Sequence, residues 1–263
     1  LIAVLTGRAE PALLHSYSGE RRAAAKGLVE FDHKWARVVG ARAEDDLTPG
    51  GLPRVAREFV NNLPFTCGLT IQYERSALTG APTHQRLATG FDIGKRFHSA
   101  PVVRLADAKP MHLGHCIAAD ARFRLFIFAP AGDAGAPGGA VANLCDWLEH
   151  DPASPLRRHT AAQEDVDAVI DTRAVFQQHF RALDHAAMPT LLRPHVGRYG
   201  LCDYEKVFCP DPKGADIFDQ RGVDRAQGAL VVVRPDQYIA HVLPLQAHAA
   251  HAAHDALDDE EDI

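Results

Sequence analysis

The sequence predicts an α/β fold in which a helical first part precedes a part rich in strands. Apolar residues between 11 and 38 recur at three- and four-residue steps, as on one face of a helix. From about Phe91 onward, short runs of β-branched and aromatic residues replace that period, which is typical of strands. We place the domain boundary in the loop-like residues 75–92, which gives two domains, 1–90 and 91–263.

Two helices are expected in the first part. Pro11 suits the first turn of a helix and Gly40 suits its end. Residues 41–52 contain few large apolar groups and are expected to form a loop. A second helix should run from Leu52 to about Glu74, and Pro64 should kink or break it because proline has no backbone N–H to donate.

The second part is expected to alternate strands and helices. Residues 122–128 begin with alternation and end apolar throughout, as in a strand that enters the middle of a sheet. The glycine-rich loop 129–139 follows, and then a helix with Val141, Leu144, Cys145 and Leu148 facing inward. The further expected elements are a strand at 166–170, a helix at 174–183, a strand at 203–208 and a terminal helix at 245–257.

A β-hairpin is the clearest local signal near the end of the chain. Residues 228–243 contain two β-branched runs around a turn, in which Pro235 pre-sets φ and Asp236 follows. We interpret Arg234 and Asp236 as residues that stabilise this turn rather than bind a ligand. A strand, a helix, a strand, a hairpin and a final helix, in this order, are typical of a thioredoxin-like α/β sandwich.

Composition limits the classes of partner. The chain has 263 residues and a net charge of −6, so we expect neither nucleic acid nor an anionic membrane as a partner. No apolar run approaches the roughly 20 residues of a membrane helix. Because the sequence starts at Leu1 without a signal-peptide pattern, we expect a fragment or a processed product.

The cysteines indicate a reducing compartment, and we expect the cytoplasm. Their number is odd, their spacing is wide and no C-x-x-C occurs, so all five are expected to be free thiols. A working thioredoxin needs two cysteines at the start of the helix after the central strand. The corresponding loop, 130–139, contains none, and Cys145 stands alone inside the helix. We therefore expect the fold to serve as a scaffold and not as a dithiol catalyst.

Three further groups of residues are candidates for sites. His248, His251 and His254, followed by Asp255, have helical spacing that could support a metal site, but we favour a solvent-facing helix. The glycines of 129–139 lack dinucleotide-binding spacing. The last group lies between residues 96 and 115. Its residues either connect two parts of the chain or form an edge strand with solvated charges. The group consists of Arg96, His98, Arg104, Asp107, His112 and His115.

Three segments resemble the flavin-dependent aromatic hydroxylases, in the group of phenol 2-monooxygenase and 3-hydroxybenzoate 4-monooxygenase. They are the Gly7-Arg-Ala segment with the Tyr17–Arg22 helix, the stretch Arg96–Arg104, and the hairpin Val231–Tyr238. The resemblance runs from Leu1 to about Leu245, and residues 104–110 are more similar to the hydroxybenzoate branch.

The resemblance implies an enzyme of which this chain is the C-terminal portion. Residues 1–90 would be the last helical part of the FAD and substrate domain, and residues 91–263 a thioredoxin-like dimerisation domain, so that we expect a homodimer. The complete enzyme would hydroxylate a phenolic ring with FAD, NADPH or NADH, and O₂. The family's catalytic residues lie upstream of the matched part, so we name no catalytic, cofactor-binding or metal-binding residue here.

Two alternatives stay open. The chain could be a stand-alone, non-catalytic thioredoxin-like interaction module, which also lacks C-x-x-C and flavin motifs. The other alternative is a metal-binding protein, in which the terminal histidines are the ligands.

Overall fold

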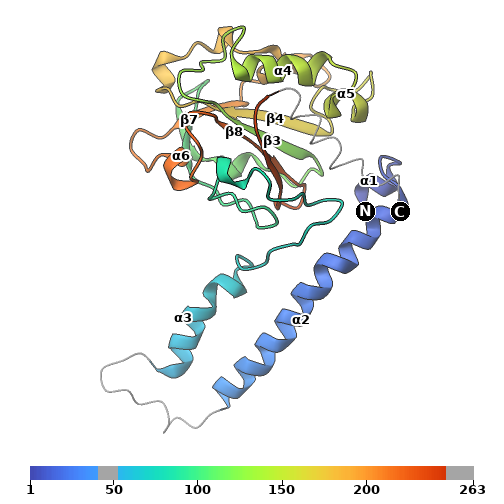
Figure 1. The fold of residues 1–263 in the computed structure, drawn as a ribbon, viewed down its shortest axis with the longest axis vertical. Helices are drawn as coiled ribbons and strands as arrows, with labels where there is room; N and C mark the ends of the chain where they lie inside the picture. The colour runs from blue at the N-terminus through green and yellow to red at the C-terminus, as the bar shows by residue number, and fades with distance from the viewer. Residues whose placement is uncertain (41–52, 247–263) are drawn as a thin grey trace.

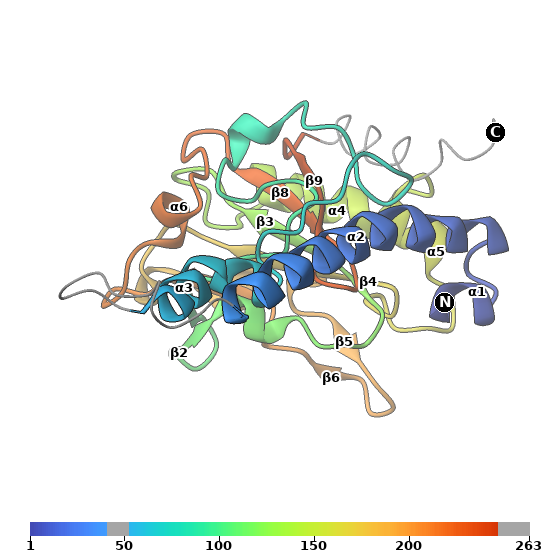
Figure 2. The ribbon, with the colours of Figure 1, turned by 90° about the horizontal axis from the view of Figure 1, so that it is seen from below.

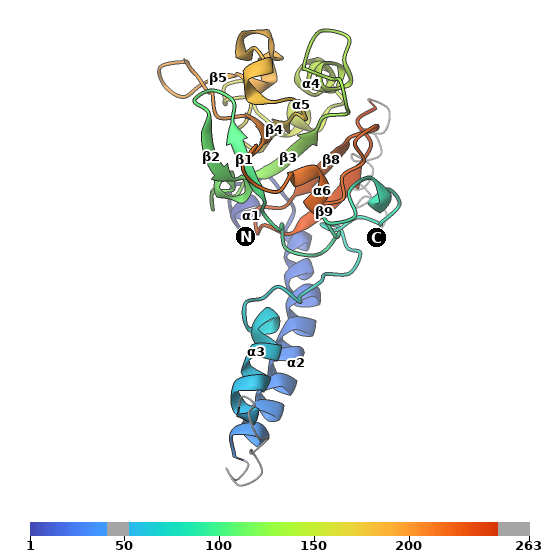
Figure 3. The ribbon, with the colours of Figure 1, turned by 90° about the vertical axis from the view of Figure 1, so that its left-hand side faces the viewer.

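A computed structural model of the chain describes residues 1–40 and 53–246, and Figure 1 shows a helical arm that projects from an α/β body. The arm consists of α2 (Leu14–Val39) and α3 (Arg54–Thr66), preceded by the short α1 (Ile2–Leu5). The rings of Phe31 and Phe65 lie 4.8 Å apart, which packs the two long helices together. Figure 3 shows both helices extending to the same side of the body.

In the arm, the first predicted helix is confirmed, and the second helix is shorter than predicted. A single 3₁₀ turn at Pro11–Leu13 precedes α2, as proline in a first turn suggests. The prediction that the second helix reaches Glu74 is wrong, because α3 ends at Thr66. Gly68 adopts a left-handed φ of 71°, and the Leu69 amide donates to the Pro64 carbonyl at 2.8 Å, which closes the helix end.

The body is built on a mixed sheet of seven strands in the order β2-β1-β7-β4-β3-β8-β9. β4 pairs in parallel with both β3 and β7, and the other neighbours are antiparallel. The strands are β1 (Pro101–Arg104), β2 (Lys109–His112), β3 (Phe123–Phe128), β4 (Ile170–Val175), β7 (Val207–Pro210), β8 (Ala229–Val233) and β9 (Ile239–Leu243).

The central strands have the thioredoxin-like arrangement that the sequence predicts. β3 leads through α4 (Ala140–His150) to its parallel neighbour β4, and the hairpin β8–β9 continues the sheet on the other side of β3. β8 is antiparallel to β3, and β9 returns antiparallel to β8. The predicted strand at 122–128, the helix after it and the hairpin are thereby confirmed.

Both faces of the sheet are covered. Leu125 and Ile127 of β3 face a core that includes α4 and α5 (Pro155–His159). Phe126 and Phe128 face a second core, to which α6 (Ile217–Gln220) and the segment 87–97 contribute. Figure 1 shows α4 and α5 on one side of the sheet and α6 on the other. Leu87 and Ala88 are buried in this second core, so the loop before Phe91 packs on the sheet.

Several predicted elements are displaced. β4 spans residues 170–175, so the strand expected at 166–170 and the helix expected at 174–183 are wrong. The strand expected at 203–208 is also displaced, because β7 starts at Val207. A small separate hairpin, β5 (His195–Val196) with β6 (Leu201–Cys202), has no counterpart in the prediction. The terminal helix expected at 245–257, with its three histidines, lies almost wholly outside the described residues.

Candidate functional site

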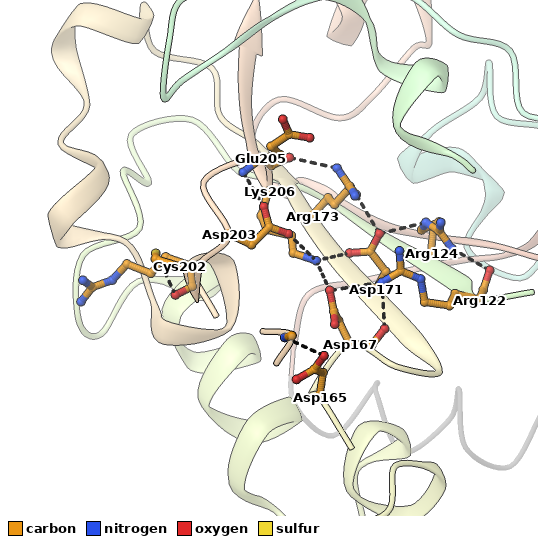
Figure 4. A network of polar contacts seen from close by, with 12 residues as sticks. Arg122, Arg124, Asp165, Asp167, Asp171, Arg173, Cys202, Asp203, Glu205 and Lys206 are labelled. Carbon is orange, nitrogen blue, oxygen red and sulfur yellow. Dashed lines mark hydrogen bonds and ion pairs between the residues drawn. The ribbon is translucent and has the colours of Figure 1, made fainter. Parts of the chain in front are cut away.

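A cluster of buried charges lies where β3 and β4 begin and β7 approaches them. Lys206 lies between Asp167 and Asp171, and its Nζ is 2.6 Å from an Asp171 carboxylate oxygen. The other oxygen of Asp171 is 2.9 Å from Nε of both Arg124 and Arg173. Arg124 and Asp171 are fully buried, and Lys206 is 1% exposed. Figure 4 shows these side chains converging on Asp171.

Surrounding residues bring the cluster to charge balance. Asp120 pairs with both Arg122 and Arg124, and Asp203 lies 3.2 Å from Nζ of Lys206. Four cations therefore meet four anions: Arg122, Arg124, Arg173 and Lys206 against Asp120, Asp167, Asp171 and Asp203. Buried charges are tolerated when they are paired in this way.

The pairing controls the protonation of the two central groups. Burial alone would raise the pKa of Asp171, but Arg173 and Lys206 outweigh it and hold that pKa below its usual range. Burial would lower the pKa of Lys206, yet Asp171 and Asp167 raise it above its ordinary value. Both groups are therefore charged at neutral pH. They form a structural ion cluster rather than an acid–base pair.

The cluster also holds the base of the β5–β6 hairpin. Asp203, directly after β6, pairs with Lys206, and its backbone N–H donates to the Pro194 carbonyl at 2.8 Å. A carboxylate oxygen of Asp165 accepts a hydrogen bond from the Gly197 amide at 2.9 Å. Figure 4 shows Asp165 and Cys202 beside the cluster. The hairpin is thus held at its base by Asp203 and at the start of its turn by Asp165, and it projects from the body, as Figure 2 shows.

A second polar contact joins the arm to the body. Both guanidinium nitrogens Nη1 and Nη2 of Arg234 bind the Glu20 carboxylate of α2, at 2.6 and 2.8 Å. Arg234 also pairs with Asp236 at 2.8 Å, within the turn of the β8–β9 hairpin. Arg21 donates to the Tyr73 hydroxyl at 3.2 Å beside this contact. Arg234 and Asp236 therefore stabilise the turn as expected, and Arg234 additionally fixes the helix α2.

The position of a thioredoxin dithiol is filled by a carboxylate. Asp133, in the loop between β3 and α4, accepts hydrogen bonds from the amides of Gly135 and Val141, at 2.8 and 2.9 Å. The bond to Val141 satisfies one amide in the first turn of α4, at the helix end where a thioredoxin would stabilise a thiolate. Burial raises the pKa of the Cys145 thiol further along the helix. All five cysteines of the chain are free, and this arrangement supports no dithiol exchange.

The six polar residues singled out between 96 and 115 do not form one site. Arg96 bonds to Gln237 at 2.9 Å, and Arg104 pairs with Asp107 and Glu205. The remaining three are His98, which is half-buried, and His112 and His115, whose exposed rings lie 5.7 Å apart. The described residues contain no group of three or more metal-ligating side chains, and His248, His251 and His254 lie outside them.

The ion cluster was not predicted from the sequence, although alternating charged residues at the start of two strands indicate it. Arg122 and Arg124 alternate at the start of one strand, and Asp171 and Arg173 alternate at the start of the next. Charges at every second position put cations and anions on the same face of adjacent parallel strands. The register that pairs Arg124 with Asp171 then brings them together.

Comparison with known proteins identifies the family. Residues 71–258 match the family described as the phenol hydroxylase C-terminal dimerisation domain. The chain belongs to this family. The phenol hydroxylase dimerisation domain therefore includes the whole sheet, the ion cluster and the β5–β6 hairpin, whereas α2 and α3 precede it.

The curated relatives of this dimerisation domain extend over the arm as well. The chain is 49% identical over 253 residues to the 3-hydroxybenzoate 4-monooxygenase of Comamonas testosteroni, covering 95% of the chain and 40% of the relative. It is 31% identical to the FAD-dependent monooxygenase terD of Aspergillus terreus, covering 94% of the chain and 42% of the relative. The chain thus spans about two-fifths of the length of these relatives.

Among solved structures, the chain is similar to aklavinone-11 hydroxylase, crystallised as a ternary complex with FAD and aklavinone. The identity is 17% and the TM-score is 0.49, with 97% of this chain and 36% of the other chain covered. The strand order of the sheet in this chain shows the thioredoxin-like fold of the phenol hydroxylase dimerisation domain. No helix among the described residues is long and apolar enough to cross a membrane.

Proposed function

We propose that this chain is the C-terminal portion of an FAD-dependent aromatic monooxygenase that hydroxylates a phenolic ring of the 3-hydroxybenzoate or phenol type. The observation that carries the proposal is the 49% identity to a 3-hydroxybenzoate 4-monooxygenase, which extends over 95% of the chain. The complete enzyme would use NADPH or NADH and O₂ and serve the catabolism of aromatic compounds. In this account the chain itself contributes assembly and support rather than catalytic groups.

The flavin is proposed to bind outside the described residues. The glycine-rich loop 129–139 is the candidate cradle for a pyrophosphate, but the Asp133 carboxylate accepts the hydrogen bonds of its Gly135 and Val141 amides. A second anion at this place would meet the negative charge of that carboxylate. This loop therefore does not fit the pyrophosphate of FAD, and we assign none of the described residues to the cofactor.

The arm is proposed to be the last helical part of the flavin domain. Large apolar side chains on α2 and α3 are at least half exposed, among them Leu28, Val29, Phe59 and Val60. Exposed apolar surface of this extent marks a contact with another part of a protein. The burial of Leu87 and Ala88 in the core of the body favours a boundary near residue 70, before the loop at 75–92 in which the sequence placed it.

The body is proposed to form a homodimer in the cytoplasm. Dimerisation is what the name of the matched family states for its domain. Five free cysteines are compatible with a reducing compartment, where disulfides are rare.

The test is to purify the protein from its natural source and follow oxidation of NADPH and of NADH with 3-hydroxybenzoate or phenol. Oxidation that depends on the aromatic compound, with a hydroxylated product, is expected. A colourless protein without such turnover would instead favour the stand-alone interaction module.

A further inference from the structure

The exposed apolar residues of the body are concentrated in one hairpin. Three large hydrophobic side chains are exposed within the described part of the matched span 71–258: Tyr199, Leu201 and Tyr204, at 78%, 68% and 54%. All three belong to the β5–β6 hairpin or directly follow it. Single exposed hydrophobic residues are ordinary, but a cluster confined to one projecting element indicates an interaction site.

Ion-pair and hydrogen-bond contacts hold the β5–β6 hairpin in a fixed position. Its base is fixed through Asp203 to Lys206, and the start of its turn is fixed through Asp165 to the Gly197 amide. Across the hairpin, the His195 ring Nδ1 lies 2.8 Å from the Gly200 carbonyl oxygen. A surface that is already ordered loses little conformational entropy when a partner binds. The buried charges thus pre-organise the element that carries the exposed aromatic residues.

We propose that the β5–β6 hairpin, with Tyr199, Leu201 and Tyr204, is the contact through which two copies of this chain associate. The inference rests on the proposed homodimer and specifies its surface. The matched family is described as a dimerisation domain, and a second copy is therefore the occupant that the hairpin fits. In a twofold dimer the same patch meets itself, so each tyrosine would lie against the hairpin of the other copy.

The size and the charges of the hairpin suit such a contact. Two tyrosines and a leucine at these exposures would bury on the order of 300–400 Å² per copy. This is roughly half of the ~800 Å² per partner of a standard interface, which leaves the rest to a polar rim. The exposed Arg198 at the tip and the exposed Glu205 beside the base supply both signs of charge, as a self-complementary surface requires.

The experiment measures the mass of the 263-residue chain in solution by sedimentation equilibrium over a range of concentrations. The variants are Tyr199→Ser with Leu201→Ser, and as matched control Val29→Ser with Val60→Ser, which removes exposed apolar groups from the arm. We expect a dimer for the unchanged chain and for the arm variant, and at least a 100-fold weaker association for the hairpin variant. Equal thermal unfolding of the separated monomers confirms that the hairpin variant is folded.

Hydrogen exchange gives an independent measurement on the unchanged chain. Amides of residues 195–204 should gain protection as the chain concentration rises through the dimerisation range. A dimer that persists in the hairpin variant, with no such gain in protection, overturns the hairpin contact but leaves the homodimer intact. An unchanged chain that is monomeric at all concentrations overturns the homodimer itself.

Discussion

Lys206 lies in an environment that its residue type rarely occupies, because lysine is almost never buried without partners. It is 1% exposed and lies against Asp167, Asp171 and Asp203. Sequence alone assigns lysine to the surface, and the alternating charges of Arg122, Arg124, Asp171 and Arg173 indicate the cluster only once the register of the strands is known. Once formed, it is balanced, and removal of one member leaves another buried charge unpaired.

The first prediction concerns Lys206→Met. This change leaves Asp171 with fewer cations, and we expect a loss of about 3–5 kcal/mol in the free energy of unfolding, as for other broken buried pairs. Urea unfolding measures it. The control is Lys95→Met, whose half-exposed pair with Asp92 should contribute under about 1 kcal/mol. Equal losses in the two variants would show that the cluster is not a stabilising unit.

The second prediction concerns pH and Asp171. Its folded pKa is held below the ~3.9 of an unfolded aspartate, so its contribution to stability is present above about pH 4 and is lost as the pH falls toward the folded pKa. Asp171→Asn lacks this contribution. The unchanged chain should therefore be more stable than the variant at pH 7, and the difference should shrink as the pH falls below about 4. A pH-independent difference would contradict the assigned ionisation.

The third prediction concerns thiol reactivity. Cys67 is exposed, whereas burial raises the pKa of the Cys209 thiol to about 12. A disulfide reagent at pH 8 should therefore modify Cys67 in the folded chain and reach Cys209 only after unfolding. Mass spectrometry of the labelled peptides distinguishes the two. Rapid native labelling of Cys209 would mean that the strand β7 opens locally.

At the scale of elements, the sequence predicted correctly those helices and strands that have a clear apolar period or characteristic turn residues. The strand at 122–128, the helix that follows and the β8–β9 hairpin carry apolar periods and turn residues, and the structure contains all three. The position of β4 was predicted wrongly because the strand contains Asp171 and Arg173, and charged residues are not expected in a buried strand. The β5–β6 hairpin was missed because two-residue strands give no detectable alternation.

The fourth prediction concerns the contact between the arm and the body. Glu20 and Arg234 are nearly buried, and Glu20→Gln removes the charge that binds the guanidinium. We expect hydrogen exchange of α2 to accelerate by at least 10-fold, with the sheet unaffected. Glu30→Gln on the same helix is the control, because the Glu30 pair with Lys26 is largely exposed. Equal exchange in both variants would show that Glu20 does not fix the arm.

At the scale of the whole molecule, the body and the arm differ in how completely their apolar side chains are buried. The body has two closed cores and one apolar hairpin, while the arm exposes apolar groups along α2 and α3. An arm of this kind needs another surface to cover it, which accords with a chain that spans about two-fifths of its relatives. Neither the ion cluster nor the hairpin surface could be derived from the resemblance in sequence.

The most direct measurement of the central claim is a visible absorption spectrum of the protein purified from its natural source, combined with its intact mass. Our account predicts flavin bands that co-purify with this sequence, on a polypeptide heavier than the 28.6 kDa of residues 1–263. A colourless species of 28.6 kDa would contradict it, and the chain would then be an interaction module without a flavin half.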